Sequence, residues 1–203
     1  MESELNMAIG SEFKSSGITE NTPKTIMLGA GTIHKGLKFS TNAWNFQESL
    51  ICATSGGSKV SIVPEFYDIP VDGALVKVKG LTVKTGETAK MEVNPIELTP
   101  EILKMALIGD ESTSETATGY SEITSRAIIK EGDYLENMAY VGKTIEGNPI
   151  IIVFDYALCT SGLELEGKNK EAAVPKFTFE CFADLTPEAD TLPYHIYYPT
   201  PTA

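Results

Sequence analysis

The chain has 203 residues, with 16 Lys and Arg against 28 Asp and Glu, which gives a formal net charge of -12. This acidic balance argues against a dedicated nucleic-acid-binding protein, because that class derives its affinity from basic contacts with phosphate. The hydrophobic content of 42% and the charged content of 22% are ordinary for a folded globular protein. A chain of this length buries about 70% of its unfolded surface and needs no metal or disulfide to hold a core.

The sequence gives no sign of a membrane segment or a secretion signal. The most apolar run, residues 150–154, is far shorter than the roughly 20 residues that span a bilayer. The first four residues are acidic rather than basic. Three widely spaced cysteines, Cys52, Cys159 and Cys181, suit free thiols in a reducing compartment. We therefore expect a protein that folds in a cytoplasm and does not associate with a membrane.

Three segments rich in polar or helix-breaking residues divide the chain. Residues 1–24 are predicted to be an N-terminal arm that becomes ordered with a partner. Residues 109–119, rich in Ser, Thr and Glu, are predicted to be a flexible, exposed loop. Residues 194–203 combine prolines with aromatic side chains and are predicted to be a C-terminal tail. The remaining residues, 25–193, are predicted to form one domain.

Between these segments apolar and polar residues mostly alternate, which indicates strands. In residues 74–84 the alternation changes parity at Gly80, which predicts a β-bulge. Residues 85–87 then predict a tight turn, with residues 89–93 returning as the second strand of a bent hairpin. Further strands are predicted at 25–28, 36–39, 120–129, 134–144, 149–158 and 177–183, with a glycine turn at 29–31 and another turn at 131–133. The run 149–158 is almost continuously apolar, which favours a strand buried on both faces.

One helix is predicted at residues 99–108. Thr99 is a suitable N-cap, Pro100 suits the first turn, and Glu101 lies at the positive end of the helix dipole. An apolar stripe follows, and Gly109 is placed to end the helix. The sequence therefore predicts a mainly β domain with one short helix packed against it.

The residues that could support catalysis do not form a recognisable constellation. The glycines before His34 lack the third glycine and the following helix of a dinucleotide-binding loop. Cys52 lies near two glycines but has no known nucleophile signature around it. Glu164 and Glu166 share one side of an expected strand, which is typical of a solvated face. We therefore expect no enzymatic activity, no cofactor and no metal site.

The order of strands and turns resembles a family of virion proteins. The matching features are residues 29–39 (GAGTIHKGLKF), Trp44-Asn45, residues 55–74 (SGGSKVSIVPEFYDIPVDGA), the helix at 99–108 and the strands over 123–158. Together they resemble the major tail tube proteins of long, non-contractile bacteriophage tails, particularly those of phages that infect Gram-positive bacteria. The resemblance spans about residues 25–185 and consists of a structural pattern rather than a catalytic motif.

The resemblance implies two packed antiparallel β-sheets, as a sandwich or barrel, with one short flanking α-helix and long extended arms, a fold related to type VI secretion tubes. In such families six subunits pair edge to edge into a ring, and stacked rings form the channel for genome delivery. The implied partners are further copies of the chain, the tape measure, tail terminator and distal tail proteins, and double-stranded DNA as transient cargo. The implied location is the virion, after synthesis and assembly in the host bacterial cytoplasm.

Two alternatives remain open at this point. The first is another virion β protein, such as a capsid decoration or tail terminator subunit, which would share the composition without forming indefinite stacks. The second is a carbohydrate-binding β-sandwich module, which usually presents aromatic side chains on one sheet face. Electron microscopy would separate the first from a tube protein, and glycan binding would identify the second.

The sequence also predicts particular assembly residues. Phe66 and Tyr67 lie in a stretch between two prolines that is expected to be a loop, and they are too apolar to remain in water. We expect them to be buried anchors between stacked rings, with Trp44 as a further candidate at the same interface. Glu122 and Glu136 lie on predicted strands and are candidates for acids that face the lumen. Residues 1–22 are expected to gain protection from hydrogen exchange on assembly.

Overall fold

The computed structural model describes residues 16–185 and 190–200. In this part of the chain the predicted mainly β fold is confirmed, because seven strands form one antiparallel sheet. Its order is β1 (Met27–His34), β8 (Leu135–Thr144), β9 (Pro149–Cys159), β10 (Phe177–Cys181), β5 (Thr82–Val93) and β4 (Lys59–Asp68). The seventh strand, β11 (Tyr194–Tyr197), pairs with the first half of β9, and β10 pairs with its end.

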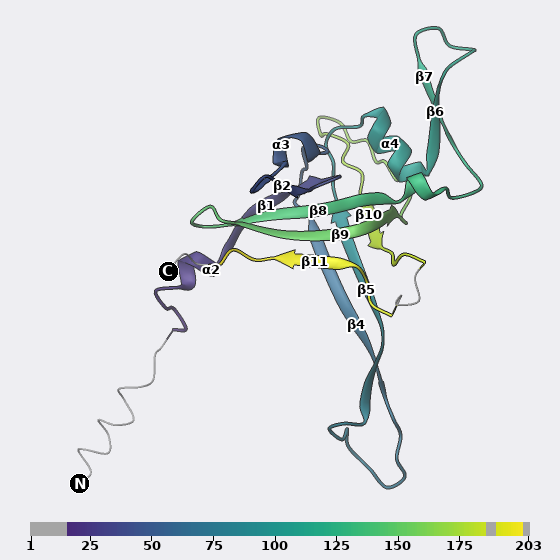
Figure 1. Cartoon of the computed structure of the whole chain (residues 1–203). Helices are drawn as coiled ribbons and strands as arrows, with labels where there is room; N and C mark the ends of the chain where they lie inside the picture. Colours follow the sequence, from purple (N-terminus) through teal and green to yellow (C-terminus); the bar gives the residue numbers. More distant parts are fainter. Residues whose placement is uncertain (1–15, 186–189, 201–203) are drawn as a thin grey trace, which may run out of the picture.

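The two expected layers are the two halves of this one sheet. Figure 1 shows β1, β8, β9 and β11 running across the molecule, while β4, β5 and β10 run steeply to them. The pairing of Phe179 with Cys159 joins the halves into a continuous ladder. The main core lies between them and combines Ile33 of β1, Met91 of β5 and Phe154 of β9, each with 0% exposure. Strong twisting therefore lets one sheet enclose its own core.

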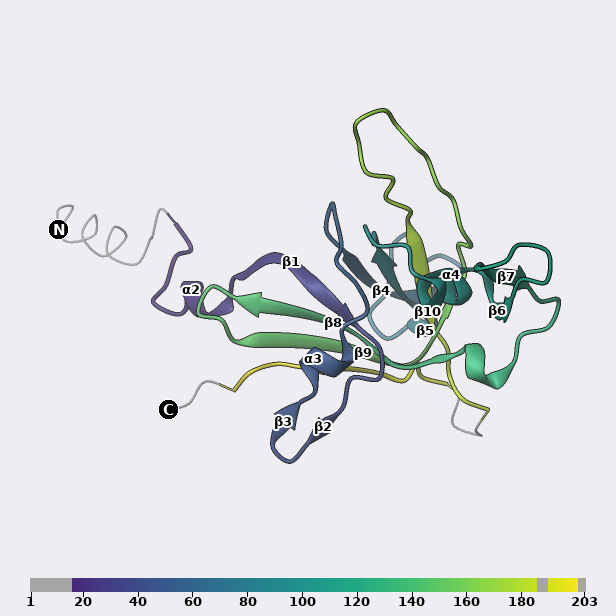
Figure 2. The ribbon, with the colours of Figure 1, turned by 90° about the horizontal axis from the view of Figure 1, so that it is seen from above.

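A smaller apolar cluster covers the opposite face of β8 and β9. It contains Leu37, Ala139, Ile151 and Val153. The segment that covers it includes β2 (Phe39–Ser40), β3 (Ala43–Trp44) and α3 (Phe46–Ser49), which project together from one side of the sheet in Figure 2. The prediction that residues 149–158 form a strand buried on both faces is thus confirmed.

The predicted helix is confirmed as α4 (Pro100–Leu107). The Thr99 hydroxyl accepts a hydrogen bond from the Ile102 amide, and Ile102 and Ala106 are buried. The predicted role of Gly109 is wrong, because the left-handed residue after the helix is Ile108, with φ of 51°. Gly109 instead begins the next strand.

Residues 109–119 match the predicted exposed loop only in part, since residues 114–119 form a loop while residues 109–113 form a strand. They begin with β6 (Gly109–Thr113), which pairs with β7 (Ser121–Ser125) to form a hairpin that projects from the domain in Figure 1. Its polar side chains are exposed, as expected, but its backbone groups satisfy each other across the ladder. Ion pairs of Arg126 with Asp110 and Asp133 connect the base of the hairpin to the short 3-10 helix η1 (Glu131–Asp133). This helix occupies the position of the predicted turn at 131–133.

The bent hairpin predicted over residues 74–93 is also wrong. β5 is one continuous strand paired with β4, and residues 85–87 lie inside it. The bulge lies opposite Glu65 and Phe66, where Glu65 pairs with Gly86 and Phe66 with Lys84, rather than at Gly80. Gly80, with φ of 93°, lies at the end of the loop between the two strands. Residues 65–68, predicted to be a loop, are therefore part of β4.

Gly29 and Gly31 form a bulge within a strand rather than the turn predicted at 29–31. β1 continues through Gly29 and Gly31, and its register with β8 shifts between Leu28 and Thr32. Both glycines have positive φ angles. A Cβ atom at Gly31 would overlap the buried ring of Tyr140, so this position needs a residue without a side chain.

The two predicted terminal segments have different outcomes. The prediction of a C-terminal tail is wrong for residues 194–197, because they form β11 in the main sheet. Tyr194 packs on the main core and Tyr197 against Trp44, so burial of aromatic surface fixes this strand. Residues 1–15 of the predicted arm lie outside the described residues, and residues 16–25 are mostly exposed and end in α2 (Thr22–Thr25). Among the described helices, none has the length and hydropathy to cross a membrane.

Candidate functional site

The end of the β4–β5 hairpin is an apolar ribbon without a covering layer. We call residues 66–68 and 82–84 the distal ribbon; it extends below the domain in Figure 1. Phe66 is 63% and Tyr67 53% exposed. Neighbouring residues of a strand point to opposite faces, so the ribbon presents an aromatic ring on each side. The predicted burial of these residues between stacked rings stays a prediction, and an isolated two-stranded ribbon of this kind is only marginally stable in water.

The loop at the end of the ribbon, residues 69–81, is also apolar, and we call it the tip loop. Leu75 is 97% and Val76 78% exposed. The base of the loop is braced at Asp68, whose carboxylate accepts hydrogen bonds from Lys77 (2.6 Å) and Thr82 (2.6 Å). These two hydrogen bonds hold the pKa of Asp68 below its ordinary value. The tip loop is therefore held in place at its base and exposes aliphatic side chains to solvent.

The main sheet ends at β1 and β4, and β11 forms a third edge beside β9. In residues 16–185 and 190–200, β4 pairs with β5 alone, and residues 27–32 of β1 pair with β8 alone. Pro64 lies in β4, which suits an edge strand because proline has no N–H to donate to a further strand. Residues 59–63 precede this proline. Both ends of the sheet can therefore accept another strand.

The outer face of β10, β5 and β4 is polar, and we call it the polar face. The opposite face of β5 sends Ala89, Met91 and Val93 into the core, so the alternate residues point outward. The Lys59 ammonium lies 2.8 Å from the Glu92 carboxylate, and Lys90 lies 2.7 Å from Glu180. The hydrogen bond from Lys90 is the main cause that lowers the pKa of Glu180. This face therefore carries charges of both signs in balanced pairs.

The two acids predicted to face a lumen are not brought together. Glu122 lies on β7 opposite Ser112, in the projecting β6–β7 hairpin. Glu136 lies on β8 opposite Tyr156, in the main sheet. Both side chains are exposed. Because they belong to separate sheets, their position relative to a channel stays a prediction.

Trp44 lines a groove on the side of the domain that carries β2 and β3. The groove has a volume of about 490 Å³. The centre of the Trp44 ring system lies 5.1 Å from the ring of Phe39 and 5.0 Å from that of Tyr197. The complete lining is Phe39, Trp44, Pro149, Ile151, Tyr197, Tyr198 and Pro199. We call this surface the aromatic groove; it joins residues 39–44 to β11, which the sequence could not place beside each other.

The segment that carries Trp44 is anchored by His34. The His34 ring is buried between the hydroxyls of Thr32 (2.8 Å from Nε2) and Ser49 (2.9 Å from Nδ1). Ser49 donates its own hydroxyl hydrogen to the Asn45 carbonyl at 2.8 Å. Nδ1 therefore carries the proton and donates to Ser49, while Nε2 accepts from Thr32. Burial lowers the pKa of His34, so the neutral ring is the stable form near pH 7.

We expect the stability of the protein to decrease as the pH falls from 7.5 to 5.5. The pKa of His34 is lower in the folded chain than in the unfolded one, so below about pH 6.5 the unfolded chain binds the additional proton. One proton contributes at most about 1.4 kcal/mol for each pH unit. Urea unfolding of dilute protein, followed through Trp44 fluorescence, measures the effect. His34→Gln should reduce the difference between the two pH values, whereas His195→Gln, at an exposed histidine, is the matched control. An unchanged pH difference in His34→Gln would contradict this role.

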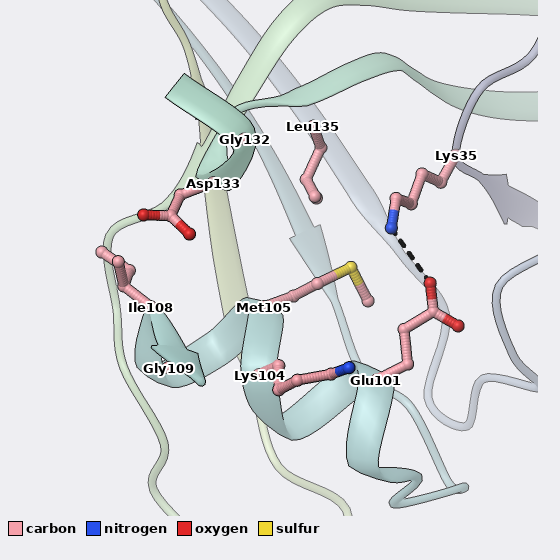
Figure 3. A pocket seen from close by; sticks show the side chains of 9 residues that line it. All are labelled: Lys35, Glu101, Lys104, Met105, Ile108, Gly109, Gly132, Asp133 and Leu135. Atoms are coloured by element: carbon pink, nitrogen blue, oxygen red, sulfur yellow. Dashed lines mark hydrogen bonds and ion pairs between the residues drawn. The ribbon is translucent and has the colours of Figure 1, made fainter. Parts of the chain in front are cut away.

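A second hollow, of about 300 Å³, lies between α4 and the residues before β8. Figure 3 shows Met105 and Leu135 pointing into it and the ion pair between Lys35 and Glu101 at one side. Lys104 pairs with Glu111 at 2.9 Å, and Asp133 is bound by Arg126. Since each of these charged groups already has a partner, the hollow is a junction that holds the helix to the sheet.

The other residues considered for chemistry occupy unsuitable positions. Cys52, Cys159 and Cys181 are buried free thiols. Burial raises the pKa of Cys52 to about 11 and that of Cys181 to about 12, so neither forms a thiolate near neutral pH. Glu164 and Glu166 lie in an irregular loop, so the strand predicted for them is wrong.

The comparisons with known proteins give a likeness to solved structures. No family model matches the chain, and no curated protein matches it. Among solved structures, a chain from a structure described as the virion of a native gene transfer agent (GTA) particle is similar, with a TM-score of 0.41 and 10% sequence identity. The match covers 76% of the present chain and 92% of the other.

Proposed function

We propose that this protein is the major subunit of a phage-type tail tube, in which rings of the chain stack around a channel for DNA. The observation that carries the proposal is that the sheet ends in β4 and β1, and that β4 and residues 27–32 of β1 have no partner strand on their outer edges among the described residues. Unpaired edges invite association, and proteins usually cover or interrupt them. Pairing of β4 of one copy with β1 of the next would cover these two edges in a closed ring.

The distal ribbon supports the stacking of such rings. Phe66 and Tyr67 are exposed on opposite faces of a ribbon that projects beyond the domain. Exposed aromatic side chains of this size are typical anchors of protein interfaces. A projection that contacts a different surface on another copy produces an open stack instead of a closed dimer. Six subunits per ring are proposed by the resemblance alone.

The polar face is our candidate for the channel wall. Its lysines and glutamates form pairs between neighbouring strands, so the face presents little net charge to a passing polyanion. The chain as a whole is acidic, which further disfavours retention of DNA. The wall of a DNA channel must be hydrated and must not bind DNA tightly, and the polar face meets both requirements.

The proposal is tested by sedimentation velocity over a range of protein concentrations. Open stacking predicts species that continue to grow in size as the concentration is raised. A capsid decoration protein, or any closed oligomer, would reach one fixed size instead. A single monomer or dimer boundary at every concentration would contradict the proposal.

A further inference from the structure

The aromatic groove has a lining that suits an aliphatic segment of protein. Phe39, Trp44 and Tyr197 form its floor, and two prolines and Ile151 complete most of its surface. Sugar sites combine an aromatic surface with convergent polar groups that fix the hydroxyls. The lining residues of this groove include no Asp, Glu, Asn, Gln, Arg or Lys. Its chemistry therefore favours apolar side chains over a glycan.

The tip loop offers side chains of the matching kind. Leu75 and Val76 are the most exposed large apolar residues among those of the hairpin, at 97% and 78%. Residues 69–81 contain two lysines and one aspartate, whereas the whole chain has a net charge of -12. Lys77 is already paired with Asp68, so the match between the loop and the groove lies in their apolar surfaces.

The tip loop and the aromatic groove lie in separate parts of one molecule. In Figure 1 the loop between β4 and β5 forms the far lower end, while β2 and β3 lie on the upper part of the domain. A contact between them must therefore join two copies. The surfaces are different, so the contact is heterologous and repeats from copy to copy.

From these observations we propose that the aromatic groove binds the tip loop of another copy, with Leu75 and Val76 against Trp44 and Tyr197. This inference rests on the proposed tube function, because it names the surface that receives the hairpin between rings. It also assigns a role to Tyr197 and Tyr198, which the sequence places in an apparent tail. Burial of Trp44 by a second copy would make its fluorescence a direct signal of assembly.

The test is disulfide formation between two full-length variants that each carry one added surface cysteine. Leu75→Cys places a thiol on the tip loop, and Tyr198→Cys, at a 53% exposed position, places one at the groove. The native cysteines are buried and remain in place. We expect a 1:1 mixture to form a cross-linked dimer under mild oxidation, and the double variant to form a ladder of multimers. The matched control mixes Leu75→Cys with Ile128→Cys, which is 75% exposed and outside both surfaces.

A second measurement follows the sole tryptophan, Trp44. Assembly of the wild type should shift its emission to shorter wavelength, and Leu75→Ser/Val76→Ser should abolish the shift while leaving circular dichroism unchanged. If tubes form but the tip thiol fails to link to the groove thiol, the inference is wrong while the tube function stands. If neither tubes nor cross-links form, both are wrong. Specific binding of a glycan that changes Trp44 emission, without cross-links, would also overturn the inference.

Discussion

Replacing Phe66 and Tyr67 together with serine is expected to give a folded subunit that no longer forms tubes. Both side chains are exposed on the distal ribbon, so their loss removes no core contact. Truncation of an aromatic anchor costs an interface about 2 kcal/mol or more. Loss of two anchors would lower the association constant about a thousandfold. Sedimentation velocity measures the assembly, and thermal unfolding of the monomer measures the fold.

The control for this variant is a second pair of adjacent exposed apolar residues. Ile128 and Ile129 are 75% and 48% exposed and lie outside the hairpin. Ile128→Ser/Ile129→Ser should assemble like the wild type, because we expect assembly to depend on Phe66 and Tyr67 and not on the overall hydrophobicity of the surface. Normal tubes from the Phe66/Tyr67 variant would remove the distal ribbon from the stacking interface.

Assembled wild-type tubes are expected to show no measurable affinity for a short DNA duplex at about 0.1 M salt, where charges are screened over about 10 Å. Glu92→Lys/Glu180→Lys should convert the balanced polar face into a basic one and retain the DNA. Each of the two acids is paired with a lysine on the surface, so loss of the pair costs less than about 1 kcal/mol of stability. The new lysines also repel Lys59 and Lys90, so thermal unfolding of the variant checks that it remains folded. Retention should weaken steeply as salt is raised, because each neutralised phosphate releases counterions. Co-sedimentation of labelled DNA with the tubes measures it.

The matched variant is Glu122→Lys/Glu136→Lys, which makes the same change of charge at the two acids predicted from the sequence. We expect this variant to retain little DNA, since Glu122 lies on the β6–β7 hairpin away from the polar face. If the Glu122/Glu136 variant binds DNA and the Glu92/Glu180 variant does not, the channel wall has been assigned to the wrong face. Strong binding by wild-type tubes would contradict the electrostatic account altogether.

Local signals explain which elements the sequence could predict. The cap at Thr99 and the apolar stripe that follows identify α4. The period of two over Phe177, Phe179 and Cys181 correctly predicts their shared burial in β10. In these elements one face meets the core, so burial imposes the pattern that the sequence displays.

The errors come from places where burial does not impose a pattern. Gly80 lies in the exposed tip loop rather than in a strand, so the change of parity there carries no information about a bulge. Gly86 was interpreted as part of a turn, yet it lies within β5 opposite Glu65. The β6–β7 hairpin is stabilised by backbone pairing, which a composition rich in Ser and Thr conceals.

The candidate surfaces were predicted in part. The sequence singles out Phe66 and Tyr67 as apolar residues between two prolines, and the structure places them, exposed, in a strand rather than in a loop. Their role at an interface stays a prediction. Trp44 belongs to β3 and makes an edge-to-face contact with Tyr197, 153 positions later in the chain. A groove built from such distant segments depends on the pairing of β11 with β9, and no local pattern predicts that pairing.

Electron microscopy of the concentrated full-length protein tests the central claim most directly. The account predicts hollow filaments of regular diameter, with rings visible in end view and a stain-filled channel along the axis. Averages of the filament should place β4 of one subunit beside β1 of its neighbour in each ring. Discrete particles of one fixed size, or solid filaments without a channel, would contradict it.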